Sequence, residues 1–196
     1  MILFGTIAFF FLGRLSVLDA FFLSVSSRTA GFMTTPIGEL PTAALFILVF
    51  LMFIGASPGS TGGGLKTTTF FAVCLIIRSQ FSGKKHQAFH RKLPKDVTAK
   101  ALLLLLFALM VVIVATFFLC IFEPNTDFLD LLVEVVSSAA TVGFSTGITA
   151  SLSIPSKIVL TLVMYVGRLG PLTAATIWSI REESALSYSE ESITIG

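Results

Sequence analysis

Residues 137–146 read Ser-Ser-Ala-Ala-Thr-Val-Gly-Phe-Ser-Thr, and residues 25–34 read Val-Ser-Ser-Arg-Thr-Ala-Gly-Phe-Met-Thr. Each stretch follows a short apolar segment and precedes a longer one. Sliding the chain 112 positions against itself superposes the two stretches, and it also pairs Leu48 with Leu160 without a gap. The chain therefore contains an internal duplication. Its predicted repeat unit is an outer helix, a short half-helix, an extended turn and an inner helix.

The composition of the chain is that of a membrane protein. Hydrophobic residues make up 55% of the sequence, charged residues only 12%, and the mean hydropathy is +0.95. A soluble domain of this length carries far more charge on its surface. We therefore expect an all-α integral membrane protein in contact with lipid. The charge pattern contains no nucleic-acid footprint, so no nucleic-acid partner is expected.

Three apolar segments are long enough to cross a bilayer, which takes about 20 residues. Segments 98–122 and 155–180 are uninterrupted, whereas segment 40–77 is broken by the Gly-rich loop, residues 55–64. Glycine and proline at this density end a helix. Non-helical backbone survives at membrane depth only where protein or a water-filled cavity surrounds it. The Gly-rich loop is therefore predicted to line a pathway.

Two further segments are too short to cross. Residues 16–27 begin with Ser16 and Asp19, and residues 127–138 begin with Asp127 and Asp130, spacings typical of a helix N-terminus. Both are predicted to be half-helices, and each leads directly into one of the duplicated turns.

The basic residues gather in one linker, which gives the orientation. Segment 123–134 contains four acids and no base, whereas seven of the 13 lysines and arginines lie in the linker: Arg78, Lys84, Lys85, Arg91, Lys92, Lys95 and Lys100. By the positive-inside rule the linker is cytoplasmic and the acidic segment faces outward. Both turns are then expected near the outer face of the membrane.

The turns at 29–32 and 141–144 suit the passage of a dehydrated cation. A pore must replace the water shell of such an ion with oxygens, and an extended turn with inward-facing carbonyls supplies them. Glycine at Gly31 and Gly143 permits backbone angles that other residues resist. Each half-helix points its C-terminal end, which carries partial negative charge, at the turn.

Thr141-Val142-Gly143-Phe144 resembles the Thr-Val-Gly-Tyr filter of potassium channels, and both repeats resemble the Trk/Ktr/HKT superfamily, in which four such repeats ring one pore. The resemblance covers nearly the whole chain and corresponds to the third and fourth repeats. It implies a selectivity filter formed by Thr29, Ala30, Gly31, Phe32, Thr141, Val142, Gly143 and Phe144. Potassium is expected at Thr29, Ala30, Gly31, Thr141, Val142 and Gly143.

The chain is accordingly divided into four parts. Residues 1–79 are expected to form the third pore repeat with a truncated first helix, 80–97 the basic cytoplasmic linker, 98–180 the fourth repeat and 181–196 a cytoplasmic tail. Two repeats cannot close a ring. The missing N-terminal repeats or a second pore-forming chain are therefore expected partners.

The Gly-rich loop corresponds in the family to an intramembrane gate beneath the filter. The resemblance assigns this role to Gly59, Ser60, Thr61, Gly62, Gly63 and Gly64, and it places Arg168 in the pore at the same depth, where it can bond loop carbonyls. A charged residue near mid-membrane is costly and is a functional candidate by default. The alternatives are a simple kink at Pro58 and an Arg168 that extends to the interface.

Lys66 and Arg28 lie beside these motifs, and their roles are inferred from their positions in the sequence. Residues 59–67 approach the nucleotide-binding pattern G-x-x-x-x-G-K-[ST], but Leu65 interrupts it and an apolar helix stands where a strand is required. Nucleotide hydrolysis is therefore not expected, and Lys66 is predicted to extend toward the cytoplasmic face. Arg28 is predicted to brace the first turn from behind by bonding carbonyls or an acid.

The sequence thus predicts potassium transport through a carbonyl filter, without enzymatic activity and without a covalent cofactor. The family resemblance implies a multi-pass protein of the plasma (inner) membrane, a homodimer, and a cytosolic nucleotide-binding regulatory ring as partner. Two alternatives remain open: a non-conducting subunit or truncated remnant of such a transporter, and a sodium-permeable cation transporter.

Overall fold

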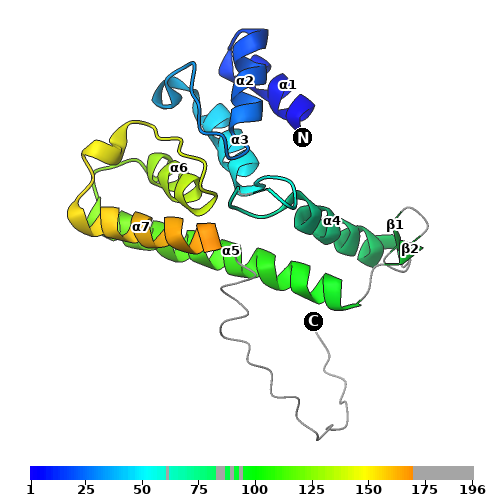
Figure 1. Cartoon of the computed structure of the whole chain (residues 1–196). Helices are drawn as coiled ribbons and strands as arrows, with labels where there is room; N and C mark the ends of the chain where they lie inside the picture. The colour runs from blue at the N-terminus through cyan, green and yellow to red at the C-terminus, as the bar shows by residue number, and fades with distance from the viewer. Residues whose placement is uncertain (61, 83–86, 89–90, 93–94, 170–196) are drawn as a thin grey trace, which may run out of the picture.

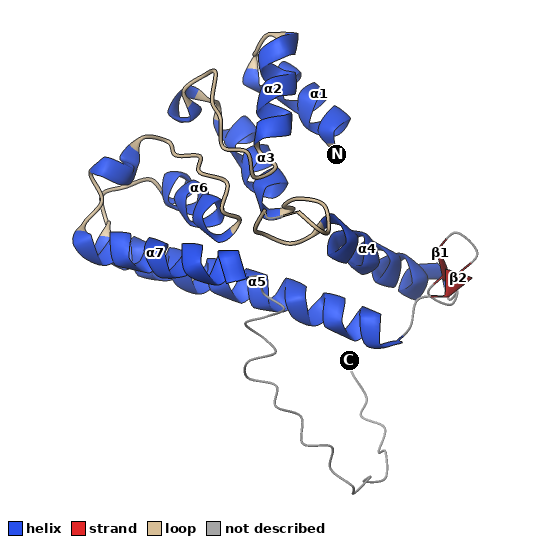
Figure 2. Ribbon diagram, in the orientation of Figure 1, coloured by secondary structure: helices blue, strands red, loops and turns tan. Residues whose placement is uncertain are grey.

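A computed structural model describes residues 1–60, 62–82, 87–88, 91–92 and 95–169 (Figure 1). The described residues form a helical protein (Figure 2). The α-helices are α1 (Ile2–Gly13), α2 (Val17–Ser26), α3 (Thr42–Phe53), α4 (Thr67–Ser82), α5 (Lys95–Phe122), α6 (Phe128–Ala139) and α7 (Ile154–Leu169). Two 3₁₀ turns, Ile37–Glu39 and Ile148–Ala150, precede α3 and α7, and two short antiparallel strands, β1 (Gln87–Ala88) and β2 (Arg91–Lys92), lie between α4 and α5. The predicted all-α fold is confirmed, with this hairpin as an addition.

The two predicted half-helices are present as α2 and α6. Ser16 is the N-cap of α2, and its Oγ accepts a hydrogen bond from the backbone N–H of Asp19 at 3.2 Å. Asp127 is the N-cap of α6, but its side chain makes no capping hydrogen bond. At 10 and 12 residues, both helices are too short to cross a bilayer.

The predicted break in the inner helix of the first repeat is also present. Helix α3 ends at Phe53 and α4 begins at Thr67. The ends of the intervening segment are joined by a parallel bridge between Ile54 and Leu65, with the Leu65 N–H donating to the Phe53 carbonyl at 3.2 Å. A side chain at Gly55 would collide with the carbonyl oxygen of Gly63. The Gly-rich loop is therefore a closed turn whose two ends touch.

Helix α5 is the one described helix that is long and apolar enough to cross a membrane, over residues Val97–Phe122. It is exposed on several sides through large apolar residues: Leu102, Leu103, Leu106, Met110, Ile113, Val114, Phe117 and Ile121. Such a surface suits lipid and not water. Helix α7, predicted as 155–180, is described only as far as Leu169.

The core lies between the two repeats. Helix α6 contacts α3, α5 and α7, while α1 contacts α2 and α3, and α4 extends along α5 (Figure 1). Leu48 and Met52 of α3, Val133 and Val136 of α6, and Phe144 are all buried in one cluster. This cluster holds the segments that follow α2 and α6 near each other.

At the end of α5 that leads into α6, Glu123 joins α5 to the start of α7. Its Oε1 accepts hydrogen bonds from the Ser153 backbone N–H at 2.7 Å and from the Ser156 Oγ at 2.8 Å. Hydrogen bonds from the side chain and backbone of Ser153, and then from Ser156, lower the pKa of this carboxyl group. The carboxylate therefore stays ionised and joins the end of α5 to the start of α7.

Candidate ion pathway

The first turn, residues 29–32, and the second turn, residues 141–144, share an unusual backbone. The φ angles are 71° at Thr29, 75° at Gly31, 54° at Thr141 and 96° at Gly143, while the residues between them keep negative φ. Backbone angles that alternate between left-handed and right-handed regions turn successive N–H groups to one side and carbonyls to the other. Left-handed angles are rare for β-branched residues such as threonine. Both turns are therefore strained in the same way.

Hydrogen bonds show which side the N–H groups face. Those of Ala30 and Gly31 donate to the Ser26 carbonyl at 3.1 and 3.2 Å, and that of Val142 donates to the Ser137 carbonyl at 2.9 Å. The acceptors are in the last turns of α2 and α6, whose carbonyls lack helical partners. The N–H groups thus point back at the half-helices. The Phe32 carbonyl also points back, since it accepts a hydrogen bond from the Ser26 Oγ of α2 at 2.6 Å. The carbonyls of residues 29–31 and 141–143 are the ones left to face a pathway.

The two turns lie against each other. A Cβ atom added to Gly31 would collide with the carbonyl oxygen of Val142, and it would lie 3.6 Å from the Cα of Gly143. A carbonyl of the second turn is thus directed at the backbone of the first. The fold brings together the two segments that the internal duplication had paired.

The Gly-rich loop lies at the foot of both turns. The N–H of Gly63 donates to the Thr141 Oγ1 at 3.0 Å, and a Cβ atom on Gly62 would collide with the Oγ1 of Thr29. Glycine is required at both loop positions because the turns leave no room for a side chain. Gly59, by contrast, has φ +84° and nothing within 4 Å of an added Cβ atom, so it lies on the open side of the loop. Thr61 lies outside the described residues.

Two cations bind carbonyls of this loop, and the position of Arg28 corrects the expectation from sequence. The Nη2 of Arg28 donates to the carbonyl of Gly55 at 2.8 Å, so Arg28 braces the Gly-rich loop and not the first turn. The Nζ of Lys66 donates to the carbonyls of Gly62 at 2.5 Å and Ser60 at 3.1 Å. Lys66 therefore bends back onto the loop, whose non-helical backbone offers carbonyls without helical partners.

Arg168 lies on α7 with its side chain exposed, and it lines a hollow of about 450 Å³ beside the second turn. Residues 141–144 and Met164 line the same hollow. The neighbouring Gly167 packs against α6, where a Cβ atom would collide with the carbonyl oxygen of Ala139. This close helix contact fixes the height of Arg168 relative to the second turn.

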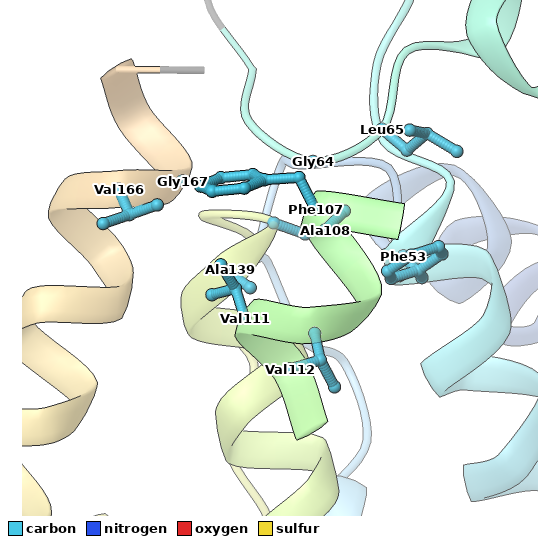
Figure 3. Close-up of a pocket in the computed structure, with 11 residues that line it drawn as sticks. Phe53, Gly64, Leu65, Phe107, Ala108, Val111, Val112, Ala139, Val166 and Gly167 are labelled. Atoms are coloured by element: carbon cyan, nitrogen blue, oxygen red, sulfur yellow. The ribbon is translucent and has the colours of Figure 1, made fainter. Parts of the chain in front are cut away.

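An apolar pocket of about 30 Å³ lies on the other side of the loop (Figure 3). Gly64 and Leu65 of the loop end meet Phe107 and Ala108 of α5 there. The remaining lining residues are Phe53, Val111, Val112, Ala139, Ala140, Val166 and Gly167. The space left beside this end of the loop is thus about the size of one water molecule.

Sequence reasoning missed Glu134. This residue of α6 is only 4% exposed, and its Oε1 accepts hydrogen bonds from the hydroxyls of Ser145 and, at 3.0 Å, Thr149. The bonds join the half-helix to the segment that leaves the second turn. The signal was an acid between apolar residues in the middle of the half-helix, since a buried polar group needs partners.

Replacing Glu134 with leucine should destabilise the protein by about 1–3 kcal/mol, because the hydroxyls of Ser145 and Thr149 lose the acceptor that they share. Glu134→Gln, which keeps a carbonyl acceptor, should cost less. The midpoint of thermal unfolding in detergent measures both, and Glu39→Leu at an exposed position is the matched control. Equal midpoints for Glu134→Leu and the unchanged protein would show that the carboxylate does not hold this segment.

The known proteins that this chain resembles are cation transport proteins, which agrees with the arrangement of the two turns. The family model described as a cation transport protein, TrkH, matches residues 13–189. The Ktr system potassium uptake protein D of Bacillus subtilis is 39% identical over 210 residues, covering 100% of this chain and 46% of that protein. The potassium/sodium uptake protein NtpJ of Enterococcus hirae is 36% identical, covering 91% and 41%.

The crystal structure of the potassium transporter TrkH from Vibrio parahaemolyticus has the same fold, with a TM-score of 0.71 at 24% identity, over 91% of this chain and 42% of that one. The chain thus spans less than half the length of these relatives. Its residues 13–189 carry the family pattern, and its helices follow the family fold. The chain therefore belongs to the TrkH family of cation transport proteins, a family of membrane transporters and not of enzymes.

Proposed function

We propose that this chain forms half of a pore that conducts potassium down its electrochemical gradient across the cell membrane. The observation that carries the proposal is the pair of strained turns lying against each other, with their N–H groups turned back to the half-helices. A pathway between them is lined by carbonyls. Such oxygens can replace the hydration shell of a monovalent cation.

In this proposal, potassium binds the backbone of Thr29, Ala30, Gly31, Thr141, Val142 and Gly143, with Phe32 and Phe144 at the ends of the turns. The half-helices α2 and α6 contribute the partial negative charge of their C-terminal ends. Strain at Thr29 and Thr141 fits this role, because residues held in unfavourable backbone regions cluster at functional sites.

The gate is proposed to be the Gly-rich loop, from Gly59 to Gly64, together with Arg168. The close contact of Gly62 and Gly63 with the two threonines supports this role, since a loop in that position obstructs the exit from the turns. Small residues let the loop move without displacing large side chains. Arg168 beside the second turn adds a positive charge that opposes cations.

The complete assembly is proposed to contain further pore repeats. Residues 1–79 and 98–180 are the third and fourth repeats, 80–97 the cytoplasmic linker and 181–196 the cytoplasmic tail, which lies outside the described residues. The remaining repeats come from a longer chain or from a second pore-forming chain. A homodimer in the plasma membrane, regulated by a cytosolic nucleotide-binding ring, completes the proposal.

A chimera tests this function. The chain replaces the segment of the Bacillus subtilis protein with which it aligns, and rubidium uptake is measured in proteoliposomes. We expect uptake that an excess of potassium suppresses and an equal excess of sodium does not. Suppression by both ions would favour the sodium-permeable alternative, which the name of the Enterococcus hirae relative motivates. A correctly inserted chimera without uptake, beside an active parent, would support the non-conducting alternative.

A further inference from the structure

Lys66 stands at the start of α4, where the chain leaves the Gly-rich loop. Its ammonium group donates to the carbonyls of Gly62, at 2.5 Å, and Ser60, at 3.1 Å. Both oxygens lie within hydrogen-bonding reach of the ammonium group, and the charge on the donor strengthens such bonds. A single cation is thus held by two carbonyls of one loop.

The position of these carbonyls relative to the turns is specific. Gly62 is the residue at which an added Cβ atom would collide with the Oγ1 of Thr29, and the next residue, Gly63, bonds Thr141. The ammonium group is therefore bound to the part of the loop that touches both turns. A cation that leaves the turns would meet this part of the loop next.

The chemistry of the two ions explains what this arrangement does. An ammonium group and a potassium ion carry the same charge and have nearly the same radius, and carbonyl oxygens hold both. A pair of carbonyls that accepts one is therefore suited to the other. A rigid, planar guanidinium would not match a spherical ion in this way.

We propose that the carbonyls of Ser60 and Gly62 form a binding site for a partly hydrated monovalent cation at the foot of the turns, which the ammonium group of Lys66 fills in this conformation. Lys66 acts as a tethered ion that competes with the permeating one. This inference rests on the proposed function and extends it, because the loop then does more than obstruct: it offers a site, and Lys66 keeps that site closed to free cations.

Local bracing is the alternative, in which Lys66 only satisfies carbonyls that the helix break leaves without partners. The chain provides a matched control for it. The Nζ of Lys157 donates to the carbonyl of Ala150 at 3.0 Å, at the start of α7 and away from the Gly-rich loop. The same substitution at either lysine removes a hydrogen bond to a carbonyl. Only the substitution at Lys66 also removes a cation near the turns, so comparing the two variants separates the two effects.

The test compares Lys66→Met with Lys157→Met in the chimera. Each substitution shortens the side chain by one atom and removes its charge. We expect Lys66→Met to raise rubidium uptake about tenfold and Lys157→Met to leave it unchanged. In Lys66→Cys, a thiol-reactive ethylammonium reagent restores a positive charge at nearly the original distance. It should return uptake to the original level, whereas a neutral methyl reagent should not.

A second measurement does not depend on flux. Crystals of the Lys66→Met chimera soaked in rubidium should show anomalous density within bonding distance of the Ser60 and Gly62 carbonyls, and crystals with Lys66 intact should lack it there. Absence of density in Lys66→Met overturns the proposed site, whatever the uptake. Inactivity of the unsubstituted chimera would count against the proposed function alone, since the density still decides whether the carbonyls bind a cation.

Discussion

Replacing Gly31 with alanine should reduce rubidium uptake by the chimera about a hundredfold or more, a larger loss than the same change at Gly143 causes. Both glycines have left-handed backbone angles that a side chain strains, with φ of 75° and 96°. At Gly31 the added methyl group also collides with the carbonyl oxygen of Val142 in the opposite turn. At Gly143 the nearest atom, the Cα of Gly31, is 4.0 Å away.

The effect of backbone strain without a steric collision can be measured at Gly147. Its φ is 101°, and nothing lies within 4 Å of an added Cβ atom, so Gly147→Ala carries the backbone penalty without the collision. We expect it to retain most of the uptake. The bulkier Gly143→Val should lose selectivity for potassium over sodium. Normal uptake and selectivity in both Gly31→Ala and Gly143→Val would show that the turns do not line the pore.

Variants that open the proposed gate should have the second large effect, which is an increase in rubidium uptake. Arg168→Ala and a deletion of Pro58 and Gly59 should each raise rubidium uptake about tenfold, because one removes a positive charge near the path and the other shortens the obstructing loop. Pro58 and Gly59 are exposed, so their loss disturbs little of the core. Arg78→Ala, an exposed arginine of α4, is the matched control.

The double variant tests whether the loop and Arg168 act together. Residues that share one network are not additive. We therefore expect the double variant to gain less, on a logarithmic scale of uptake, than the two single variants combined. Strict additivity would contradict a shared gate, and unchanged uptake in both single variants would assign Arg168 to helix packing.

Features that depend on residues close together in the sequence could be predicted. The caps at Ser16 and Asp127, the glycines that adopt positive φ and the break before Thr67 each depend on residue type and near neighbours. The duplication also indicated which two turns belong together, although only the fold shows that Gly31 touches Val142.

Features that depend on distant or irregular contacts were not predictable. Arg28 and Gly55 are 27 residues apart, and their bond exists because α2 and the Gly-rich loop meet at one depth. Lys66 bonds residues that are close to it in the sequence. These bonds form only because the irregular backbone of the Gly-rich loop brings the carbonyls to the ammonium group. Periodicity cannot reveal either partner, since it describes regular helices only.

The bridge between Ile54 and Leu65 has a mechanical consequence. It closes residues 55–64 into a ring of backbone, so the two helices that flank the ring stay at a fixed separation while the ring changes shape. Because its ends are already joined, the ring gains little additional chain entropy when it swings aside. Displacement of the ring then needs no unwinding of α3 or α4. In the proposed gate, the loop would then move as a flap on a fixed frame, at the speed of a loop and not of a helix.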